Sequence, residues 1–395
     1  MADKKLPHKM GDAQDAYHGD GPQEGDGWRY DATDRRFELG KLSTISRANK
    51  TVYVDQAATG AGDGTSWTDA FTTIQDAVDS LEDIIVHDYT IRVRKGTNPY
   101  RETVYLNSDP ANHPAKLILG SLSIEGEHYW NANCDNNAVA GDIVDADADF
   151  DDVEVGDRVL LLDFNGASSK CQAYEVCTVD DISGAAGGTI GTDGAKTATT
   201  GWRYIIVKTK VSGSDDGTDG GTARNYIFHL QTVDNVGIKG LWMDFSDSLA
   251  IFYTYCRGMT LNTCIIENCD YGVRAVGMTY LTAQYCFFGV QGWLGLGAGE
   301  QSVVGAYYDA YEGGGAASGV HAERSCYVNS RYSYFDNCAC AIDARDVSMV
   351  TGWHSTIEND CTVGLRATFN SGLDKSNVTN NAGTAESTSD GGVIA

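Results

Sequence analysis

The 395-residue sequence has few basic residues, few prolines and no long apolar run, and each shortage excludes a class of protein. Its 29 Lys and Arg against 55 Asp and Glu give a net charge of −26, which disfavours binding to nucleic acid or to an anionic membrane. No run reaches the roughly eighteen apolar residues of a membrane span, and residues 1–10 lack the apolar core of a secretory signal. With 5 Pro beside 46 Gly and 21 Tyr, the composition favours short strands and tight turns over packed helices.

The 11 cysteines would indicate disulfides in an exported protein, but their odd number and the missing export signal favour reduced thiols. Zinc-binding and serine-nucleophile signatures are also missing, so no cofactor is expected. Asp145-Ala-Asp147-Ala-Asp149 resembles the start of a calcium loop, although Phe150 and Gly156 stand where that loop needs glycine and glutamate. We interpret this segment as a solvated acidic turn, with calcium left open as an alternative.

The C-terminal half contains a repeat with a period of about twenty-two residues. Ile266-Glu-Asn, Phe335-Asp-Asn and Ile357-Glu-Asn align as an apolar residue, an acid and an asparagine. Phe288 and Tyr311 continue the apolar column in two degenerate copies. Short strands at this spacing cannot each bury an apolar face alone, but stacked coils share one interior. The period therefore predicts a parallel β-helix in which these five apolar residues lie one above another.

A second column of the repeat is polar and is expected to point outward. Each clear copy continues with a small residue, an apolar residue, a variable residue and alanine, as in Gly272-Val-Arg-Ala275. We expect the variable position to form the best surface on which to search for chemistry. Its predicted members are Arg274, Gln291, His321, Asp343 and Arg366.

Turn residues are predicted at two further places in the repeat. Asn268, Asn337 and Asn359 occupy equivalent positions, and asparagine tolerates the left-handed backbone of a tight corner. We expect their amides to bond along the stack as a ladder. The run Gly295-Leu-Gly-Ala-Gly299 is expected to be a loop of glycine turns.

The whole chain is expected to be all-β, a right-handed parallel β-helix with an N-terminal capping helix. Residues 68–81 carry apolar side chains at helical spacing, and this helix would cover the N-terminal end of the stack. The predicted segments are an extended arm over 1–50, the cap and first coils over 51–140, a small β insertion over 141–211, and further coils over 212–395.

Four segments resemble the N-terminal cap and first coils of pectin-lyase-like right-handed parallel β-helix proteins, namely residues 53–67, 70–78, 92–97 and 100–102. That superfamily includes lyases, glycosidases, adhesins and bacteriophage spikes. The chain looks most like the spike, appendage or decoration proteins of phage virions. This resemblance implies a homotrimeric virion protein, made in the host cytoplasm without a signal peptide and attached to a capsid or tail protein through residues 1–50.

Host-surface glycans are the expected ligands of such an appendage, with no role for nucleic acid or membrane. The alternative is a lyase or glycoside hydrolase acting on an acidic or neutral polysaccharide, and a third hypothesis is a bacterial adhesin. We favour the protein without enzymatic activity, because the polygalacturonase signatures Asn-Thr-Asp and Gly-His-Gly are missing. No catalytic residue is therefore assigned from the resemblance.

Five side chains are weak catalytic candidates. Glu267, Asp336 and Glu358 share a column, where neighbouring rungs would hold carboxylates roughly 5 Å apart, as some glycosidases require. His321 and Arg274 could serve the proton abstraction of a lyase. Solvated surface positions explain all five more simply.

Aromatic residues are the better candidates for binding, because the chain has more of them than narrow coils can bury. Flat rings on a rigid β surface stack on sugars or form subunit contacts. The sequence does not separate these two uses. The selected residues are Trp242, Tyr271, Trp293 and Trp353.

Overall fold

The computed structural model describes residues 26–31, 36–41, 44–107, 112–131, 134–135, 140–164, 171–185, 188–195, 202–213, 226–244, 249–314 and 317–395. Half of the predicted arm, residues 1–25, lies outside this set. Within the rest of the arm, β1 (Asp26–Asp31) and β2 (Arg36–Lys41) pair antiparallel. None of the described helices is both long and apolar enough to cross a membrane.

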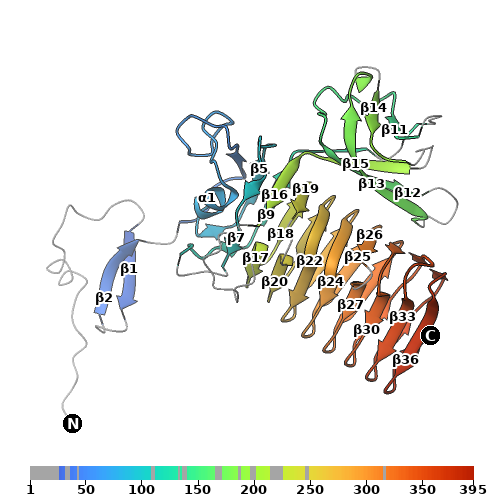
Figure 1. Ribbon diagram of the computed structural model, residues 1–395. Coiled ribbons are helices and arrows are strands. Elements are labelled where there is room, and N and C mark those ends of the chain that lie inside the picture. Colours follow the sequence, from blue (N-terminus) through green and yellow to red (C-terminus); the bar gives the residue numbers. More distant parts are fainter. Residues whose placement is uncertain are drawn as a thin grey trace, which may run out of the picture.

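The chain winds into the predicted all-β, right-handed parallel β-helix, whose coils stack from the N-terminal cap to the C-terminus (Figure 1). Its strands form an 11-stranded sheet and a 16-stranded sheet. The larger sheet holds two parallel rows of strands, because β22 (Ile265–Val276) and β24 (Phe287–Ala298) run from one row into the other. The solenoid therefore has three faces.

The three faces are named here by what lies on them. The open face is the 11-stranded sheet: β3 (Lys50–Val54), β5 (Asp88–Val93), β9 (Ser121–Gly126), β18 (Val236–Lys239), β21 (Met259–Asn262), β23 (Tyr280–Gln284), β25 (Val303–Tyr307), β28 (Tyr327–Arg331), β31 (Met349–Thr351), β34 (Gly372–Asp374) and β37 (Val393–Ile394). The covered face is β6 (Tyr100–Arg101), β16 (Thr209–Ser212), β19 (Leu241–Asp244), the first parts of β22 and β24, β26 (Ala310–Gly313), β29 (Tyr334–Asp336), β32 (Thr356–Ile357) and β35 (Thr379–Asn380). The pocket face is β7 (Val104–Leu106), β17 (Tyr226–Gln231), β20 (Leu249–Thr254), the last parts of β22 and β24, β27 (Ser318–Ala322), β30 (Cys340–Ala344), β33 (Val363–Thr368) and β36 (Thr384–Ser389).

The predicted apolar column stacks as expected. Strand registers pair Ile266 with Phe288, then Tyr311, then Phe335, then Ile357. The rings of Phe288 and Tyr311 are parallel at 4.9 Å, and those of Tyr311 and Phe335 at 4.8 Å. These spacings equal one rung of a parallel sheet, so all five side chains fill a single continuous interior.

The N-terminal helix is shorter than predicted. α1 spans Ile74–Asp79 and buries its apolar side chains against the first coils. It begins late because Thr73 has extended backbone and accepts the amide of Asp76 as the N-cap. The carboxylate of Glu102, from the first coil, accepts the amides of Ile74 and Gln75 at 2.9 and 2.8 Å. The chain before Thr73 instead bridges strand β3 at Phe71.

The predicted β insertion is a six-stranded antiparallel sheet. It begins before the predicted start at residue 141, and β16, inside the predicted range, belongs to the solenoid. A two-stranded pair, β4 (Ile84–Ile85) and β8 (Leu117–Ile118), forms a sheet of its own, and its Ile85 and Ile118 side chains join the solenoid core. The insertion strands, in sheet order, are β10 (His128–Asn131), β15 (Trp202–Val207), β12 (Arg158–Asp163), β13 (Ala173–Asp181), β14 (Thr189–Thr192) and β11 (Asp142–Val144).

The insertion lies over the covered face (Figure 1). Its side chains Leu160, Leu162, Ile205 and Val207 form one buried cluster with outward residues of the solenoid. The solenoid members of that cluster are Ile265, Phe287, Ala310 and Tyr334. The middle of one of the three faces is thus covered by the chain itself.

The predicted asparagine ladder does not form. Asn268 and Asn337 have the expected left-handed backbone, with φ of 55° and 47°, but β24 and β26 lie between their coils. Asn359, in the coil next to that of Asn337, does not have a left-handed backbone, and the Asn337 backbone amide donates to Asp360 Oδ1 at 3.5 Å. The Asn268 amide donates to Asp244 instead, at 2.8 Å. The glycine run from Gly295 to Gly299 is also not a loop of turns, because most of it lies inside β24.

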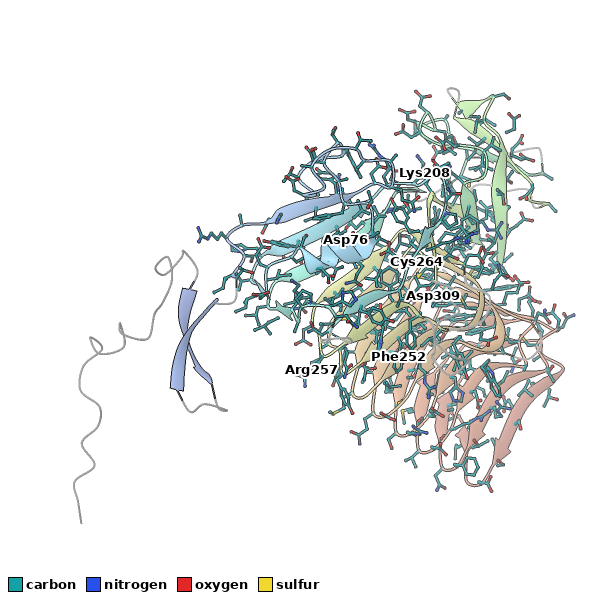
Figure 2. All side chains as sticks on the ribbon, turned by 60° about the vertical axis from the view of Figure 1, so that its left-hand side comes forward. Asp76, Lys208, Phe252, Arg257, Cys264 and Asp309 are labelled. Carbon is teal, nitrogen blue, oxygen red and sulfur yellow. The ribbon has the colours of Figure 1, made fainter. Side chains whose placement is uncertain are left out.

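Cysteines fill the interior, as expected for reduced thiols. All eleven are free and buried. Cys264 and Asp309 lie inside the stack, whereas Arg257 is exposed at its edge (Figure 2). Burial raises the pKa of the Cys256 thiol to about 11, so this thiol stays protonated near neutral pH.

Candidate functional site

The outward column of the pocket face differs from the sequence prediction at one position. Registers pair Arg274 with Gly297, Gly297 with His321, and His321 with Asp343. Glycine 297 therefore holds the place predicted for Gln291. The predicted alignment is wrong here because the part of β24 that joins its two rows is longer than the same part of β22. Cys269 of β22 pairs with Val290 of β24, whereas Tyr271, two residues later, pairs with Leu294, four residues later.

A pocket lies at this column, where Gly297 contributes no side chain and the Leu294 side chain packs over its backbone. The pocket has a volume of about 410 Å³ and lies across β22, β24, β27, β30 and β33. Its lining residues are Tyr271, Arg274, Trp293, Leu294, Gly297, Ala298, Ser318, His321, Glu323, Ala339, Arg345 and Arg366.

Asp343 is the centre of the charged network beneath the pocket. Its side chain is fully buried and accepts hydrogen bonds from both Nε and Nη2 of Arg366, the first at 2.9 Å. Arg345 Nη2 lies 2.7 Å from its Oδ2, and Nδ1 of His321 lies 3.2 Å from the same atom. A buried carboxylate with this many charge-assisted bonds fixes the positions of its cationic partners.

Glu323 links the other cations of the pocket. Its Oε1 accepts a hydrogen bond from Arg274 Nη2 at 3.0 Å, and its Oε2 lies 3.6 Å from Nε2 of His321. His321 therefore stands between two carboxylates. Three arginines oppose two carboxylates here, so the pocket is cationic within a chain whose net charge is −26.

The pKa values of this network follow from its contacts. Burial disfavours the charged form of His321, but its bonds to Asp343 and Glu323 outweigh burial and raise its pKa. The hydrogen bond with His321 lowers the pKa of Glu323 to about 2. Burial alone would raise the pKa of Asp343, yet hydrogen bonds from Arg366, His321 and Arg345 hold it far below its ordinary value. Both carboxylates are ionised at neutral pH.

An aromatic platform borders the cationic cluster. Trp293 is 68% exposed, and its ring lies parallel to that of Tyr271, with centroids 6.5 Å apart and an interplanar angle of 11°. An exposed flat ring next to guanidinium donors can hold a sugar ring by its apolar face and an acidic substituent by ion pairing. Two predicted binding residues therefore meet two weak catalytic candidates, Arg274 and His321, in one pocket.

The charged groups of this pocket are held in ion pairs that suit the binding of an anion. The ionised Glu323 and Asp343 have no proton to give to a leaving group. His321 is held toward its protonated form by two carboxylates, which removes the lone pair that a general base needs.

The other predicted catalytic residues lie on the covered face, beside the insertion. Glu267 pairs with Arg158 of β12, whose Nε lies 3.0 Å from Oε2. Asp336 lies 3.5 Å from the Tyr174 hydroxyl of β13. Burial, and then a hydrogen bond shared with Asp360, raise the pKa of Asp336 to about 7.

Glu358 is in the next coil, beside the Tyr334 hydroxyl. It belongs to the same row of acids as Asp336, since β29 and β32 pair in register up to Ile357. The three acids are therefore neither in the pocket nor fully solvated, because the insertion shields their column.

The two remaining predicted binding residues are separated from the pocket. Trp242 is partly buried beneath the insertion, with Lys210 Nζ 3.9 Å from its ring centroid. Trp353 lies at a corner of the solenoid, 4.2 Å from the ring of His354, with the Arg331 guanidinium 5.0 Å away. Both rings take part in packing with neighbouring side chains.

Sequence reasoning missed Gly297, Glu323 and Arg345. A signal for Gly297 was present, because Gly295-Leu-Gly-Ala298 has the small, apolar, variable, alanine pattern of the repeat. Glu323 and Arg345 each follow the alanine of their copy, so the position after alanine was the column to examine.

Among the described residues, no group of three His, Cys, Asp or Glu side chains is arranged to hold a metal ion. In the segment that resembles a calcium loop, Asp145 is buried and accepts the Tyr204 hydroxyl at 2.8 Å. Its other oxygen accepts the amide of Asp147, a turn within the insertion.

Comparisons with known proteins find likeness in structure alone. No known family matches the sequence, and no curated protein matches it. The tailspike protein of Pseudomonas phage LKA1 is 14% identical over 82% of this chain, with a TM-score of 0.26, and the chain spans 58% of its length. A tailspike of Acinetobacter baumannii bacteriophage AP22, solved with a capsular saccharide, is 10% identical over 74% of this chain and 71% of its own, with a TM-score of 0.25.

The pectin methylesterase of Aspergillus niger is 10% identical over 89% of this chain and 85% of its own, with a TM-score of 0.41. The stacked strand registers establish the fold independently of these likenesses. It is a right-handed parallel β-helix.

Proposed function

We propose that this protein is a glycan-binding appendage of a bacteriophage virion, and that its ligand is an acidic sugar held in the pocket of the pocket face. One observation carries the proposal: the exposed Trp293 ring lies beside a cluster in which three arginines oppose two carboxylates. The ring supplies an apolar platform for a pyranose, and the guanidinium groups supply donors for its carboxylate.

An acidic ligand fits the charge of the site better than a neutral one. Asp343 binds both Arg366 and Arg345 by side chain, and each guanidinium has five N–H donors, so donors remain for a second anion. The chain as a whole is strongly acidic, so it repels an acidic ligand from most of its surface. The cationic pocket is a place where such a ligand is attracted.

Binding is tested by calorimetric titration of the full chain with polygalacturonate and with uncharged dextran. We expect binding of polygalacturonate that weakens as salt increases, and none of dextran. Trp293→Ala should weaken binding about tenfold, the effect of losing an interface contact of roughly 1.4 kcal/mol. Leu119→Ala, a similarly exposed apolar residue on the first coils, is the control and should bind like the wild type. Equal binding by Trp293→Ala and wild type would contradict the assignment.

Attachment to the virion through residues 1–50, and assembly as a homotrimer, belong to the same proposal. Its support is the position of this segment at the start of the solenoid, where its last residue, Lys50, begins β3. Deletion of residues 1–50 should abolish particle attachment while the circular dichroism of the β-helix is kept. A deletion variant that still attaches to particles would exclude this role for the arm.

A second candidate, glycoside hydrolysis, is favoured by Asp336 alone. A carboxyl whose pKa is raised to about 7 can act as a general acid, with an ionised acid of the same column as its partner. Release of reducing ends from a panel of acidic and neutral polysaccharides, abolished in Asp336→Asn, would establish it. If no polysaccharide of the panel releases reducing ends, glycoside hydrolysis is excluded and binding remains the proposed function.

A further inference from the structure

The insertion is fastened to the covered face at two ends, and the first end is held by ion pairs. Strand β12 runs from a base at Arg158 to a tip at Asp163, and β13 returns beside it. At the base, Arg158 donates from both Nε and Nη2 to the carboxylate of Glu267 on β22, the first at 3.0 Å. Next to it, the buried Asp157 lies 2.7 Å from Nζ of Lys95, which follows β5. The base is therefore held by opposite charges.

The tip of the insertion is held by hydroxyl and backbone contacts instead. The Tyr174 hydroxyl of β13 lies 3.5 Å from Oδ2 of Asp336 on β29, and its ring lies 5.4 Å from the ring of Tyr334. The amide of Cys171 donates to the carbonyl of Tyr332 at 3.4 Å. Because none of these contacts joins opposite charges, the polar attachment of the tip is weaker than that of the base.

The acids beneath the insertion differ in the same way between base and tip. Registers place Glu267, Gly289, Glu312 and Asp336 in one row of the covered face. Glu267, under the base, has Arg158 as its counter-charge. Among the described residues, neither Glu312 nor Asp336 forms an ion pair with a lysine, an arginine or a histidine. The acids under the tip are therefore not compensated by a cation.

Asp336 is surrounded by groups that are acidic or neutral. Burial, and then the hydrogen bond shared with Asp360, raise its pKa to about 7, and the charges of Glu312 and Glu358 act in the same direction. A closed tip therefore encloses a neutral carboxyl at low pH and an uncompensated carboxylate at high pH. The titratable groups that face Asp336 are Glu312 of β26, Tyr334 of β29, Cys338 after β29, Glu358 and Asp360 after β32, and Tyr174 of the insertion.

We propose that the insertion is a pH-sensitive lid, whose base stays attached while its tip rises from the coil of β29 as the solution becomes alkaline. With the tip closed, an ionised Asp336 lies among three other acids without a cation; with the tip raised, water solvates it. The raised tip also exposes the rings of Phe287 and Tyr334, on which Tyr174 packs. The ligand pocket contains none of these residues, so the lid does not depend on the proposed ligand.

Protonation of Asp336 favours the closed tip. A carboxyl whose pKa is higher in the closed state than in the raised state stabilises the closed state at low pH. This advantage is lost as the pH rises through about 7. The ratio of raised to closed tips should then grow by up to about tenfold for each further pH unit.

Two buried thiols report separately on the tip and on the fold of the insertion. Cys171 is buried between the tip and the solenoid, whereas Cys177 is buried in the insertion's own core. The full chain is treated with iodoacetamide at pH 6, 7, 8 and 9, and modification of each cysteine is followed by mass spectrometry. Each rate is divided by the rate in Asp336→Asn at the same pH, so that ionisation of the thiol itself cancels.

We expect Cys171 to react at similar rates in both proteins at pH 6, and about tenfold faster or more in the wild type at pH 9. Cys177 should react alike in both proteins at every pH. The matched control is Asp346→Asn, which removes an exposed acid outside the row and should behave like the wild type. A Cys171 rate ratio that does not change with pH would overturn the proposal. So would an equal acceleration of Cys177, because the insertion would then unfold rather than rise.

A second variant tests the lid without a substitution at the partly buried Asp336. Glu312 is exposed, so Glu312→Gln should fold like the wild type. It removes one of the charges that disfavour ionised Asp336 under a closed tip. The acceleration of Cys171 at pH 9 should therefore fall by about twofold to fivefold, the effect of one partly exposed charge pair. An acceleration equal to that of the wild type would show that the acid row does not drive the movement.

Discussion

Replacement of Asp343 by asparagine tests the structural basis of the pocket. The substitution keeps the shape of the side chain, removes its charge, and replaces one acceptor oxygen by a donor that faces the guanidinium of Arg366. Arg366, Arg345 and His321 then remain close together without their common counter-charge. Both the stability of the chain and the geometry of the pocket should suffer.

The expected loss of stability can be bounded. Removal of one partner from a buried ion pair costs about 3–5 kcal/mol, because the other partner is left uncompensated. The three cations are partly exposed here, so water stabilises them in the variant. We therefore expect the free energy of unfolding to fall by on the order of 3 kcal/mol at pH 7, the low end of that range.

The pH dependence of the effect has a definite sign. Hydrogen bonds hold the pKa of Asp343 in the folded chain below its ordinary value of 3.8. A depressed carboxyl pKa contributes stability that is complete above the unfolded value and is lost as the pH falls through the folded value. The difference between wild type and Asp343→Asn should thus be constant from about pH 5 to about pH 6 and shrink below about pH 4. It should shrink again above neutral pH, because the bond to Asp343 helps to raise the pKa of His321 and its contribution is lost when His321 loses its proton.

Urea unfolding of both proteins at pH 7, 5 and 3 measures this difference, with the exposed Asp88→Asn as the control. The control should unfold within about 0.5 kcal/mol of the wild type at each pH. A loss in Asp343→Asn below that size at pH 7 would refute the network as described. A loss that is undiminished at pH 3 would show that the charge of Asp343 is not its source.

Two further substitutions and one titration test the interior and the covered face. Tyr311→Ala should lower the free energy of unfolding by about 3–5 kcal/mol, because its ring is fully buried and stacked on both sides. Urea unfolding measures this loss, and a loss below about 1 kcal/mol would contradict the stack. Asp309→Asn should raise the melting temperature at pH 8 but not at pH 4. Burial raises the pKa of Asp309, so the native carboxyl costs stability as the pH rises, whereas asparagine carries no charge at either pH. Equal shifts of the melting temperature at both pH values would refute this. The carboxyl carbon of Asp336 should titrate in NMR spectra with a midpoint of about 7, and a midpoint of about 4 would exclude the proposed burial by the insertion.

The interior of the β-helix was predictable because its constraint repeats in the sequence. Ile266, Phe335 and Ile357 must each fill the same position in successive coils, so similar residues recur at the spacing of one coil. Outward positions carry no such constraint. The alignment therefore failed at Gln291, where the coil lengthens on the surface while its buried strands keep their register.

The covered face could not be predicted, because it depends on contacts between distant segments. Leu160 of the insertion packs against a cluster that includes Phe287, more than a hundred residues later, and neither segment has a period that indicates the other. The raised pKa of Asp336 follows from the same packing, so the sequence suggested only a solvated acid there. The pocket was found in part, since the repeat placed Arg274 and His321 in one column.

The place of the insertion in the chain affects how the protein must be made. Its apolar underside, which includes Leu162 and Ile205, is complete once residue 207 has been synthesised, but its cover extends to Tyr334. A growing polypeptide therefore leaves the ribosome with a finished sheet whose cover begins only at Ile265 and is completed only at Tyr334, more than a hundred residues after Val207. During this interval the exposed underside can bind other nascent chains or chaperones, so productive synthesis depends on rapid winding of the coils from β22 to β29.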